Sequence, residues 1–187
     1  MPNSYTPIIT ELLRPPPANP LGPGAPNESV RPLLTELTVE KLFGGQPLKD
    51  RDMAACCLAG LWLYHDFLDE SHHISQEIET SSGSYWHGLM HRREPDFDNA
   101  KYWFRRVGQH PVFEPLQITA AKLAATGNLD RHAAFLTTQS QWDPFAFIDL
   151  CEACAEGKSD AAMLCRQIQG REWELLFEHC YRRALGM

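Results

Sequence analysis

The sequence predicts an all-α fold: a single compact domain of about seven to nine helices over residues 31–187, preceded by a proline-rich, extended N-terminal arm over residues 1–30. Three observations lead to this prediction. Apolar residues recur at helical spacing along most of the chain, and glycines and prolines bound the periodic segments. No segment alternates apolar and polar residues as a strand does. The 187 residues, 43% of them hydrophobic, suffice for one buried core.

The arm is expected to contain neither helix nor sheet. Six prolines fall between Pro15 and Pro26, and proline removes a backbone donor and fixes its own φ. Four apolar residues near the beginning of the arm are expected to anchor it on the domain: Ile8, Ile9, Leu12 and Leu13.

The first helices of the domain are expected to begin at short polar side chains. Asn27 or Ser29 begins the first one, Thr38 restarts it, and Gly44–Gly45 ends it. The longest apolar helix then begins near Asp50.

That helix carries a row of side chains that changes from apolar to polar. The row comprises Leu58, Leu61, Trp62, His65, Asp69, His72 and Gln76. If the helix is continuous, the core opens onto a polar cavity at this level, and His65 is the first candidate to face it. Alternatively, the helix ends near Asp69, and His72 and His73 lie at the surface.

Residues 83–110 combine aromatic, cationic, imidazole and carboxylate side chains. They contain three of the eight histidines, two of the five tryptophans and four arginines. A core segment would be more aliphatic and a surface helix would have fewer large rings, so we interpret this stretch as the wall of a ligand pocket. It is predicted to form two helices, one from Gly83–Ser84 to Pro95 and one from Asp96 or Asp98 to Gly108.

The first of these two helices contains a candidate metal site. His87, His91 and Glu94 occur at i, i+4 and i+7 and therefore share one helix face. Two imidazoles and a carboxylate are a suitable ligand set for a divalent metal ion, with Glu94 either completing the set or orienting a ring. Arg92 and Arg93 face other directions, where they can pair with Asp96 or Asp98. Alternatively, both histidines are hydrogen-bonded core residues.

The second helix supplies candidate ligand contacts. Arginine forks bind carboxylates and phosphates, and aromatic rings form pocket walls. The candidate catalytic residues are His65, His87 and Arg105. The candidate ligand-binding residues are Trp86, Tyr102, Trp103, Arg106 and Asn99. In the alternative interpretation, Arg105 and Arg106 pair with nearby carboxylates and only join the two helices.

The C-terminal third is predicted to contain four further helices. They begin near His110–Pro111, near Leu129, at Asp143–Pro144 and at Ser159. Glycines end three of them, at positions 127, 157 and 186.

Composition limits the function. The net charge of −7 argues against a nucleic-acid partner, because a phosphate-binding face needs a basic excess. No apolar run approaches the length of a membrane span, and the first residues do not resemble an export signal. We therefore expect a cytoplasmic protein without a membrane partner, with six reduced cysteines. Cys151 and Cys154 form a C-x-x-C, which is interpreted as two small core residues.

The run from about His65 to Pro111 resembles a small family of uncharacterised bacterial proteins that share a YWHxxxHRREPDF…NAKYWFRRVG-like core. The resemblance covers about a quarter of the chain. It implies no activity and therefore assigns no catalytic residue.

Three functions agree with these patterns. The first is an enzyme that acts on a small polar or anionic molecule, with or without a divalent metal ion as cofactor. The second is a non-catalytic module that binds a small-molecule ligand. The third is a structural or interaction protein whose polar stretch is an internal hydrogen-bond network.

Overall fold

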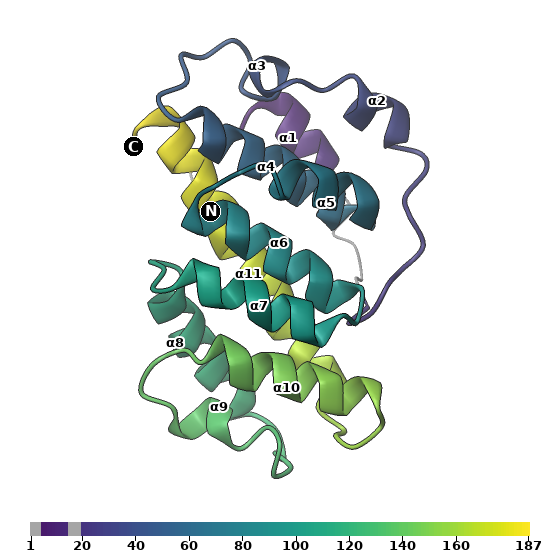
Figure 1. The fold of residues 1–187 in the computed structure, drawn as a ribbon, viewed down its shortest axis with the longest axis vertical. Helices are drawn as coiled ribbons and strands as arrows, with labels where there is room; N and C mark the ends of the chain where they lie inside the picture. Colours follow the sequence, from purple (N-terminus) through teal and green to yellow (C-terminus); the bar gives the residue numbers. More distant parts are fainter. Residues whose placement is uncertain (1–4, 15–19) are drawn as a thin grey trace.

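The computed structural model describes residues 5–14 and 20–187, and every regular element in these residues is a helix, as the sequence predicts (Figure 1). The eleven helices of this part of the chain are α1 (Pro7–Leu12), α2 (Arg31–Thr35), α3 (Val39–Leu42), α4 (Arg51–Tyr64), α5 (Leu68–Ser75), α6 (Ser81–Arg93), α7 (Phe97–Val107), α8 (Phe113–Ala124), α9 (Phe135–Thr138), α10 (Pro144–Ala155) and α11 (Ala162–Leu185). They exceed the expected seven to nine because α1 was not expected and because the long apolar helix is divided into α4 and α5.

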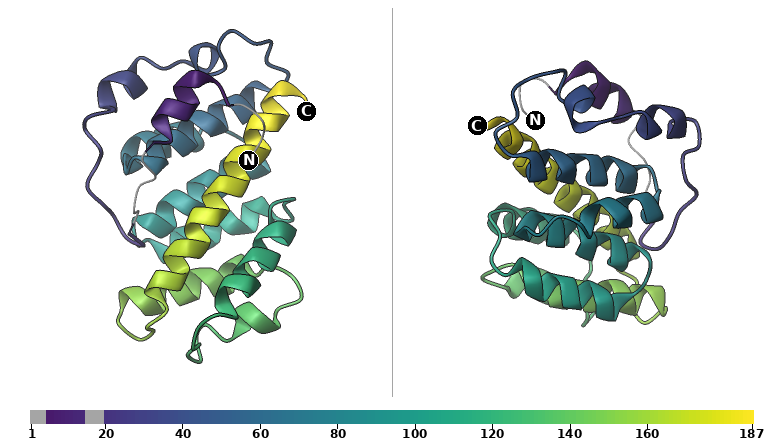
Figure 2. Two further views of the ribbon diagram at one scale, coloured as in Figure 1. Left: turned by 180° about the vertical axis from the view of Figure 1, so that it is seen from behind. Right: turned by 45° about the horizontal axis from the view of Figure 1, so that its top comes forward.

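Helix α6 lies at the centre of the molecule. In Figure 1, α4 and α5 lie on one side of it and α7 and α10 on the other, while α11 runs diagonally behind them (Figure 2). Every residue of α6 except Ser81 is buried. The apolar side chains of all these helices form one connected core. Helix α6 is thus the element against which the other helices pack.

Two glycines allow rings to pack closely against the helix backbones. A Cβ atom at Gly88 of α6 would lie 2.8 Å from the ring of Phe104 on α7, and one at Gly60 of α4 would lie 2.8 Å from the ring of Trp86. The bounds of α7 follow the predicted signals: the Asp96 side chain accepts from the backbone N–H of Asn99, and Gly108 ends the helix. These caps hold α7 against α6.

The expectation that residues 1–30 contain no helix is wrong for Pro7–Leu12. Proline is compatible with the first turn of a helix, where its missing N–H has no intrahelical partner, and the Thr6 side chain caps the same turn. Ile9 and Leu12 of α1 are fully buried in the core, so the expected anchoring of this segment is confirmed. The prolines at positions 15–17 lie outside the described residues.

The long apolar helix ends before it reaches the polar residues of the row from Leu58 to Gln76. Helix α4 stops at Tyr64, His65 is its C-cap, and Asp66 adopts a positive φ of 64° before α5 begins. The N-terminal segment stabilises this break: the backbone N–H of Asn27 donates to the His65 carbonyl at 3.0 Å. The row from Leu58 to Gln76 is therefore divided between two helices.

Arg92 and Arg93 pair with different acids from those expected. Arg92 donates to Glu172 of α11, which also accepts from the hydroxyl of Tyr85 at 2.9 Å, and all three side chains are buried. Arg93 donates to Asp66 and to the carbonyl of Gly22. Asp96 instead caps α7, so sequence proximity did not decide the pairing.

Candidate metal centre

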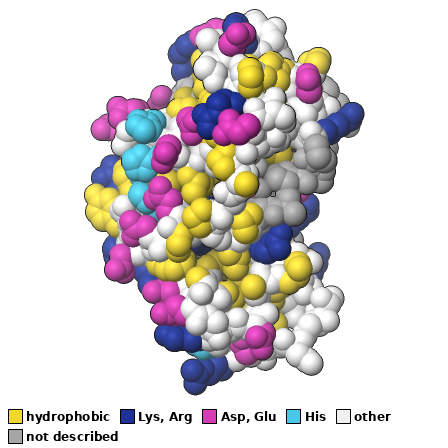
Figure 3. Space-filling model, turned by 90° about the vertical axis from the view of Figure 1, so that its right-hand side faces the viewer, with side chains coloured by type: hydrophobic (Ala, Val, Ile, Leu, Met, Phe, Trp, Pro, Cys, Tyr) yellow, Lys and Arg dark blue, Asp and Glu magenta, His cyan; other side chains and the backbone are white. Residues whose placement is uncertain are grey.

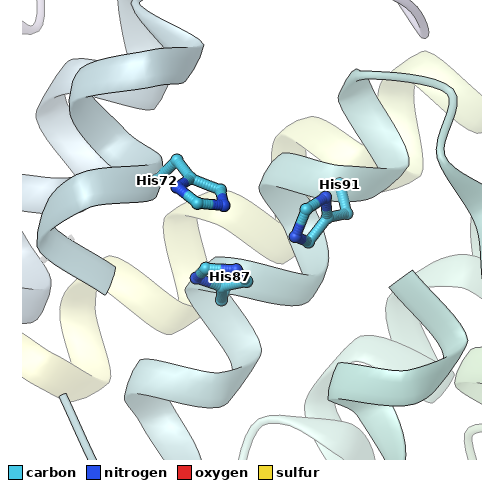
Figure 4. A group of neighbouring side chains, drawn as sticks. All are labelled: His72, His87 and His91. Atoms are coloured by element: carbon cyan, nitrogen blue, oxygen red, sulfur yellow. The ribbon is translucent and has the colours of Figure 1, made fainter. Parts of the chain in front are cut away.

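Three histidine rings from two helices converge beside α6. His72 comes from α5, and His87 and His91 come from successive turns of α6 (Figure 4). One ring nitrogen of each lies within 4.8 Å of one ring nitrogen of both others. Their ring centroids are 4.5 Å apart for His72–His87, 4.7 Å for His87–His91 and 5.3 Å for His72–His91. Three side chains placed in this way could hold a single metal ion.

A serine orients the ring of His87. The Ser75 hydroxyl lies 3.3 Å from the carbonyl oxygen of His72 and 3.0 Å from Nδ1 of His87. Because a hydroxyl has one hydrogen and donates it to the carbonyl, it accepts from Nδ1–H of His87. The lone pair of Nε2 of His87 is then available to a metal ion.

A carboxylate orients the ring of His91 in the same way. Glu94 Oε2 lies 3.0 Å from Nδ1 of His91, and a carboxylate oxygen of Asp96 lies 4.0 Å from the same atom. Nδ1–H therefore donates to Glu94, and Nε2 carries the lone pair. A histidine that donates one ring N–H to a carboxylate while its other nitrogen binds metal is a recurrent feature of metal sites.

Burial keeps two of the three rings neutral. Burial, together with the neighbouring rings of His91 and His72, lowers the pKa of His87 to about 3. Burial also lowers the pKa of His91, although the Glu94 carboxylate opposes the shift. Neutral imidazole is the form that binds metal ions, so both rings have the protonation state of a ligand. The amide of Asn99 donates to Nε2 of His91 at 3.1 Å, so it must move before that atom can bind an ion.

Trp103 covers one side of the cluster, and only His72 is partly exposed. The ring centroid of Trp103 lies 4.0 Å from that of His87, and the guanidinium of Arg106 stacks over the indole at 5.1 Å. Asn99 Nδ2 lies 3.1 Å from Nε2 of His91. His72 is only partly buried, and Figure 3 shows histidine side chains reaching the surface among acidic ones. The cluster therefore reaches the surface at His72, whereas His87 and His91 are 2% and 4% exposed.

The structure brings together some of the predicted site residues. His87, His91, Glu94, Asn99 and Trp103 lie together, with Glu94 beside Nδ1 of His91 and outside the group of three converging ligand atoms.

The other predicted site residues lie elsewhere or at the edge. His65 caps α4, next to Asn27, and Trp86 packs against Trp173 in the core. Tyr102 is 48% exposed, and Arg105 is exposed. Arg106 is exposed as well and reaches the cluster only through Trp103.

His72 was not among the predicted ligands. The sequence placed His72 on the row of side chains from Leu58 to Gln76, but helical spacing along that row gave no reason to expect it beside His87. A ligand from another helix has no fixed spacing to the first pair, so only the packing of α5 on α6 reveals it.

The six cysteines are all free thiols, as predicted. No helix in residues 5–14 and 20–187 combines the length and the apolar character needed to cross a membrane. No protein-family model, no curated protein and no solved structure matches the chain.

Proposed function

We propose that this protein is a metal-dependent enzyme whose centre is a divalent ion of the zinc class held by His72, His87 and His91. The observation that supports this most is the convergence of three imidazoles in which two have their second nitrogen already engaged by Ser75 or Glu94. Three histidines are a common catalytic zinc set, because they leave a further position for water or substrate.

The separation of the rings suits a site that tightens on binding. Zinc–nitrogen bonds of about 2.0–2.1 Å in tetrahedral geometry place two ligand nitrogens roughly 3.3 Å apart. Because the present nitrogens lie within 4.8 Å of one another, binding requires a shift of at most about 1.5 Å between any two of them. His72 is the ring to move, because it is only partly buried whereas His87 and His91 are enclosed.

The proposed chemistry is hydrolysis of a small polar substrate. A bound divalent ion lowers the pKa of a coordinated water and polarises a substrate carbonyl or phosphoryl oxygen. The side-chain amide of Asn99 now donates to Nε2 of His91, and once an ion displaces it there it is proposed to donate to a substrate oxygen, while Trp103 excludes water from one side. Arg106, which lies over Trp103, is the cation proposed to attract an anionic substrate from the solvent.

Metal analysis of untagged protein tests the proposal. The expected result is one zinc-class ion per chain, lost in His72→Ala, His87→Ala and His91→Ala. His73→Ala is the matched control, because His73 is next to His72 on α5 but exposed, with its Nδ1 at 2.6 Å from the Asp69 carbonyl. Metal content that is absent from the wild type after reconstitution, or equal in all four variants, contradicts a metal centre.

Hydrolytic activity is tested separately with 4-nitrophenyl acetate as a small ester. Chelation is expected to abolish the metal-dependent hydrolysis, and His91→Ala to reduce it by at least about a hundredfold. A small phosphate monoester and a small amide are tested in the same way. If the protein is fully loaded with metal but hydrolyses none of the three substrates, the metal centre stands and the proposed hydrolytic activity is refuted.

A structural hydrogen-bond network is the second candidate function of the cluster. The burial of His87 and His91 and their bonds to Ser75 and Glu94 favour it. In that case each alanine substitution lowers the free energy of unfolding by about 1–3 kcal/mol, the cost of leaving a buried partner unpaired. Metal ions then have no effect on the melting temperature of the wild type.

A further inference from the structure

Two thiols face each other where a short turn joins the end of α10 to the beginning of α11 (Figure 2). Cys154 is the last residue but one of α10, and Cys165 is the fourth residue of α11. Their Sγ atoms lie 3.9 Å apart. Cys151, the other cysteine of the C-x-x-C motif, lies one turn earlier on α10 and is buried. The thiol that contacts Cys154 thus comes from the next helix.

Cys154 is the cysteine that a reagent in solution reaches first. It is partly exposed, whereas the other five cysteines of the chain are buried. Cys165 is 0% exposed. Because a reagent needs access to the sulfur that it modifies, the first reaction takes place at Cys154, and Cys165 takes part only through its contact with Cys154.

The turn between the two helices holds these thiols in place. The backbone N–H groups of Lys158 and Ser159 donate to the carbonyl of Ala153, at 2.8 and 3.2 Å. The Asp130 carboxylate accepts from the hydroxyl of Ser159 at 2.6 Å and from the backbone N–H of Asp160 at 3.2 Å. The end of α10 and the beginning of α11 are thereby tied to each other, so the two sulfurs are neighbours throughout the lifetime of the folded chain.

The separation of the two sulfurs allows a disulfide after a small movement. A disulfide bond is about 2.0 Å long, so the sulfurs of Cys154 and Cys165 must approach by about 1.9 Å. Cysteine changes its rotamer by rotation about the Cα–Cβ bond, which moves Sγ and leaves the backbone in place. The bridge therefore requires movement of side chains and not a rearrangement of the helices.

Disulfide chemistry suits these cysteines better than metal binding. Cys151 lies close enough to Cys165 for a hydrogen bond between their thiols. In residues 5–14 and 20–187, however, the three ligand atoms that lie within 4.8 Å of one another belong to the histidine cluster, so the three thiols do not surround a common point. Metal ligands converge on one ion, whereas a disulfide needs only two sulfurs in contact.

We propose that Cys154 and Cys165 are a redox modification site, at which a small-molecule disulfide of the glutathione class is reduced and an intramolecular disulfide forms. The Cys154 thiolate attacks one sulfur of glutathione disulfide, the S–S bond of the reagent breaks, and one glutathione leaves. The Cys165 thiolate then attacks Sγ of Cys154 and releases the second glutathione. Two protein thiols are oxidised, and the two departing glutathione thiolates take up the two protons. The site lies outside the histidine cluster, which belongs to α5 and α6.

Burial slows the reaction at neutral pH. It raises the pKa of Cys154, whereas hydrogen bonds with Ser159 and Cys165 lower this pKa. The hydrogen bond with Cys151 and burial raise the pKa of Cys165. The thiolate is the attacking form, so the oxidation is measured at mildly alkaline pH. A chelator in the buffer prevents oxidation by metal ions and removes any contribution of the proposed metal centre.

Mass spectrometry of the native protein treated with glutathione disulfide tests the proposal. The expected product has lost two hydrogen atoms and carries no glutathione, and the number of free thiols falls from six to four. Peptide mapping is expected to locate the bridge between Cys154 and Cys165. Three results overturn the proposal: six free thiols after the treatment, a lasting glutathione adduct on Cys154, or a bridge between other cysteines.

Variants assign the roles of the two thiols. Cys154→Ala is expected to form neither a bridge nor an adduct, because its remaining cysteines are buried. Cys165→Ala is expected to keep one glutathione on Cys154, because no thiol displaces it. Cys180→Ala is the matched control, since Cys180 is also a fully buried cysteine of α11, and it is expected to form the bridge at the wild-type rate.

The outcome is decided even if Cys165→Ala does not fold, because Cys154→Ala replaces a partly exposed side chain and tests the attacking thiol by itself. Formation of a disulfide by native Cys154→Ala refutes the role of Cys154. Formation of a disulfide by native Cys165→Ala, without a glutathione adduct, refutes the role of Cys165. A bridge that fails to form in Cys180→Ala contradicts the assignment to Cys154 and Cys165.

Discussion

The contribution of the buried ion pair between Arg92 and Glu172 to the packing of α6 can be tested by substitution. Glu172 is fully buried and accepts from both Arg92 and Tyr85. Glu172→Ala removes both acceptors, and the guanidinium of Arg92, of which two nitrogens already have no partner in the described residues, keeps its charge in the core. The guanidinium then retains only its stacking on the Phe147 ring, at 4.8 Å.

The expected loss of stability is large. Removing one partner of a buried ion pair costs about 3–5 kcal/mol, because the remaining charge is uncompensated. For a chain of this length each kcal/mol corresponds to about 2–4 °C, so the melting temperature is expected to fall by about 6–20 °C. Glu174→Ala is the matched control two residues away, where the pair with Arg171 is half-exposed and its loss costs about 0–1 kcal/mol.

The assay is urea unfolding followed by far-UV circular dichroism at constant pH. The double variant Arg92→Met with Glu172→Leu is expected to recover most of the lost free energy, because an apolar pair of similar volume leaves no buried charge. If Glu172→Ala and Glu174→Ala destabilise the protein equally, the pair does not hold α6 and the argument from burial fails.

Three further predictions follow from the geometry. Ser75→Ala and Glu94→Gln are each expected to weaken zinc binding about 10–100-fold in a competition assay with a chelating dye, and unchanged affinity would contradict the assigned ring orientations. Burial lowers the pKa of His110 to about 4, with the neighbouring His179 contributing, so its protonation favours the unfolded chain. Stability from this group is complete above pH 6.5 and falls by about 3 kcal/mol as the pH drops towards 4, and urea titrations of wild type and His110→Gln at both ends of this range should show the difference. Gly88→Ala is expected to destabilise the protein by about 1–3 kcal/mol because the facing ring must move, whereas Gly170→Ala is expected to stabilise it by about 0.5–1 kcal/mol; equal effects would refute the close packing.

Local signals in the sequence predicted the helices well where capping residues decide the bounds. Asp96 and Gly108 bound α7, and Asp143 with Pro144 begins α10, as expected. An end of the long apolar helix near Asp69 was one of two alternatives, but its position at Tyr64 was not predicted, because no glycine or proline marks it. Asp66 takes a left-handed conformation there because Arg93 and the N-terminal segment hold it in place, and such tertiary contacts leave no local pattern.

For the candidate site, too, the sequence predicted what lies on one helix and missed what depends on the packing of two helices. The pair of His87 and His91 follows from helical spacing alone, and so does the position of Glu94 on the same face. The participation of His72 depends on the angle at which α5 packs on α6. That angle depends on where the long apolar helix breaks, after Tyr64, and helical periodicity does not give that position.

The burial of α6 has a consequence for hydrogen exchange. Because helices cover this element on all sides, its amide hydrogens are expected to exchange with solvent only when the whole molecule unfolds. Helix α5 is eight residues long and partly exposed, so its amides are expected to exchange through local opening at a lower free energy. His87 and His91 therefore belong to the slowest-exchanging part of the molecule, and His72 to a part that opens more often. The rate at which the three rings assemble or separate is then governed by α5 alone.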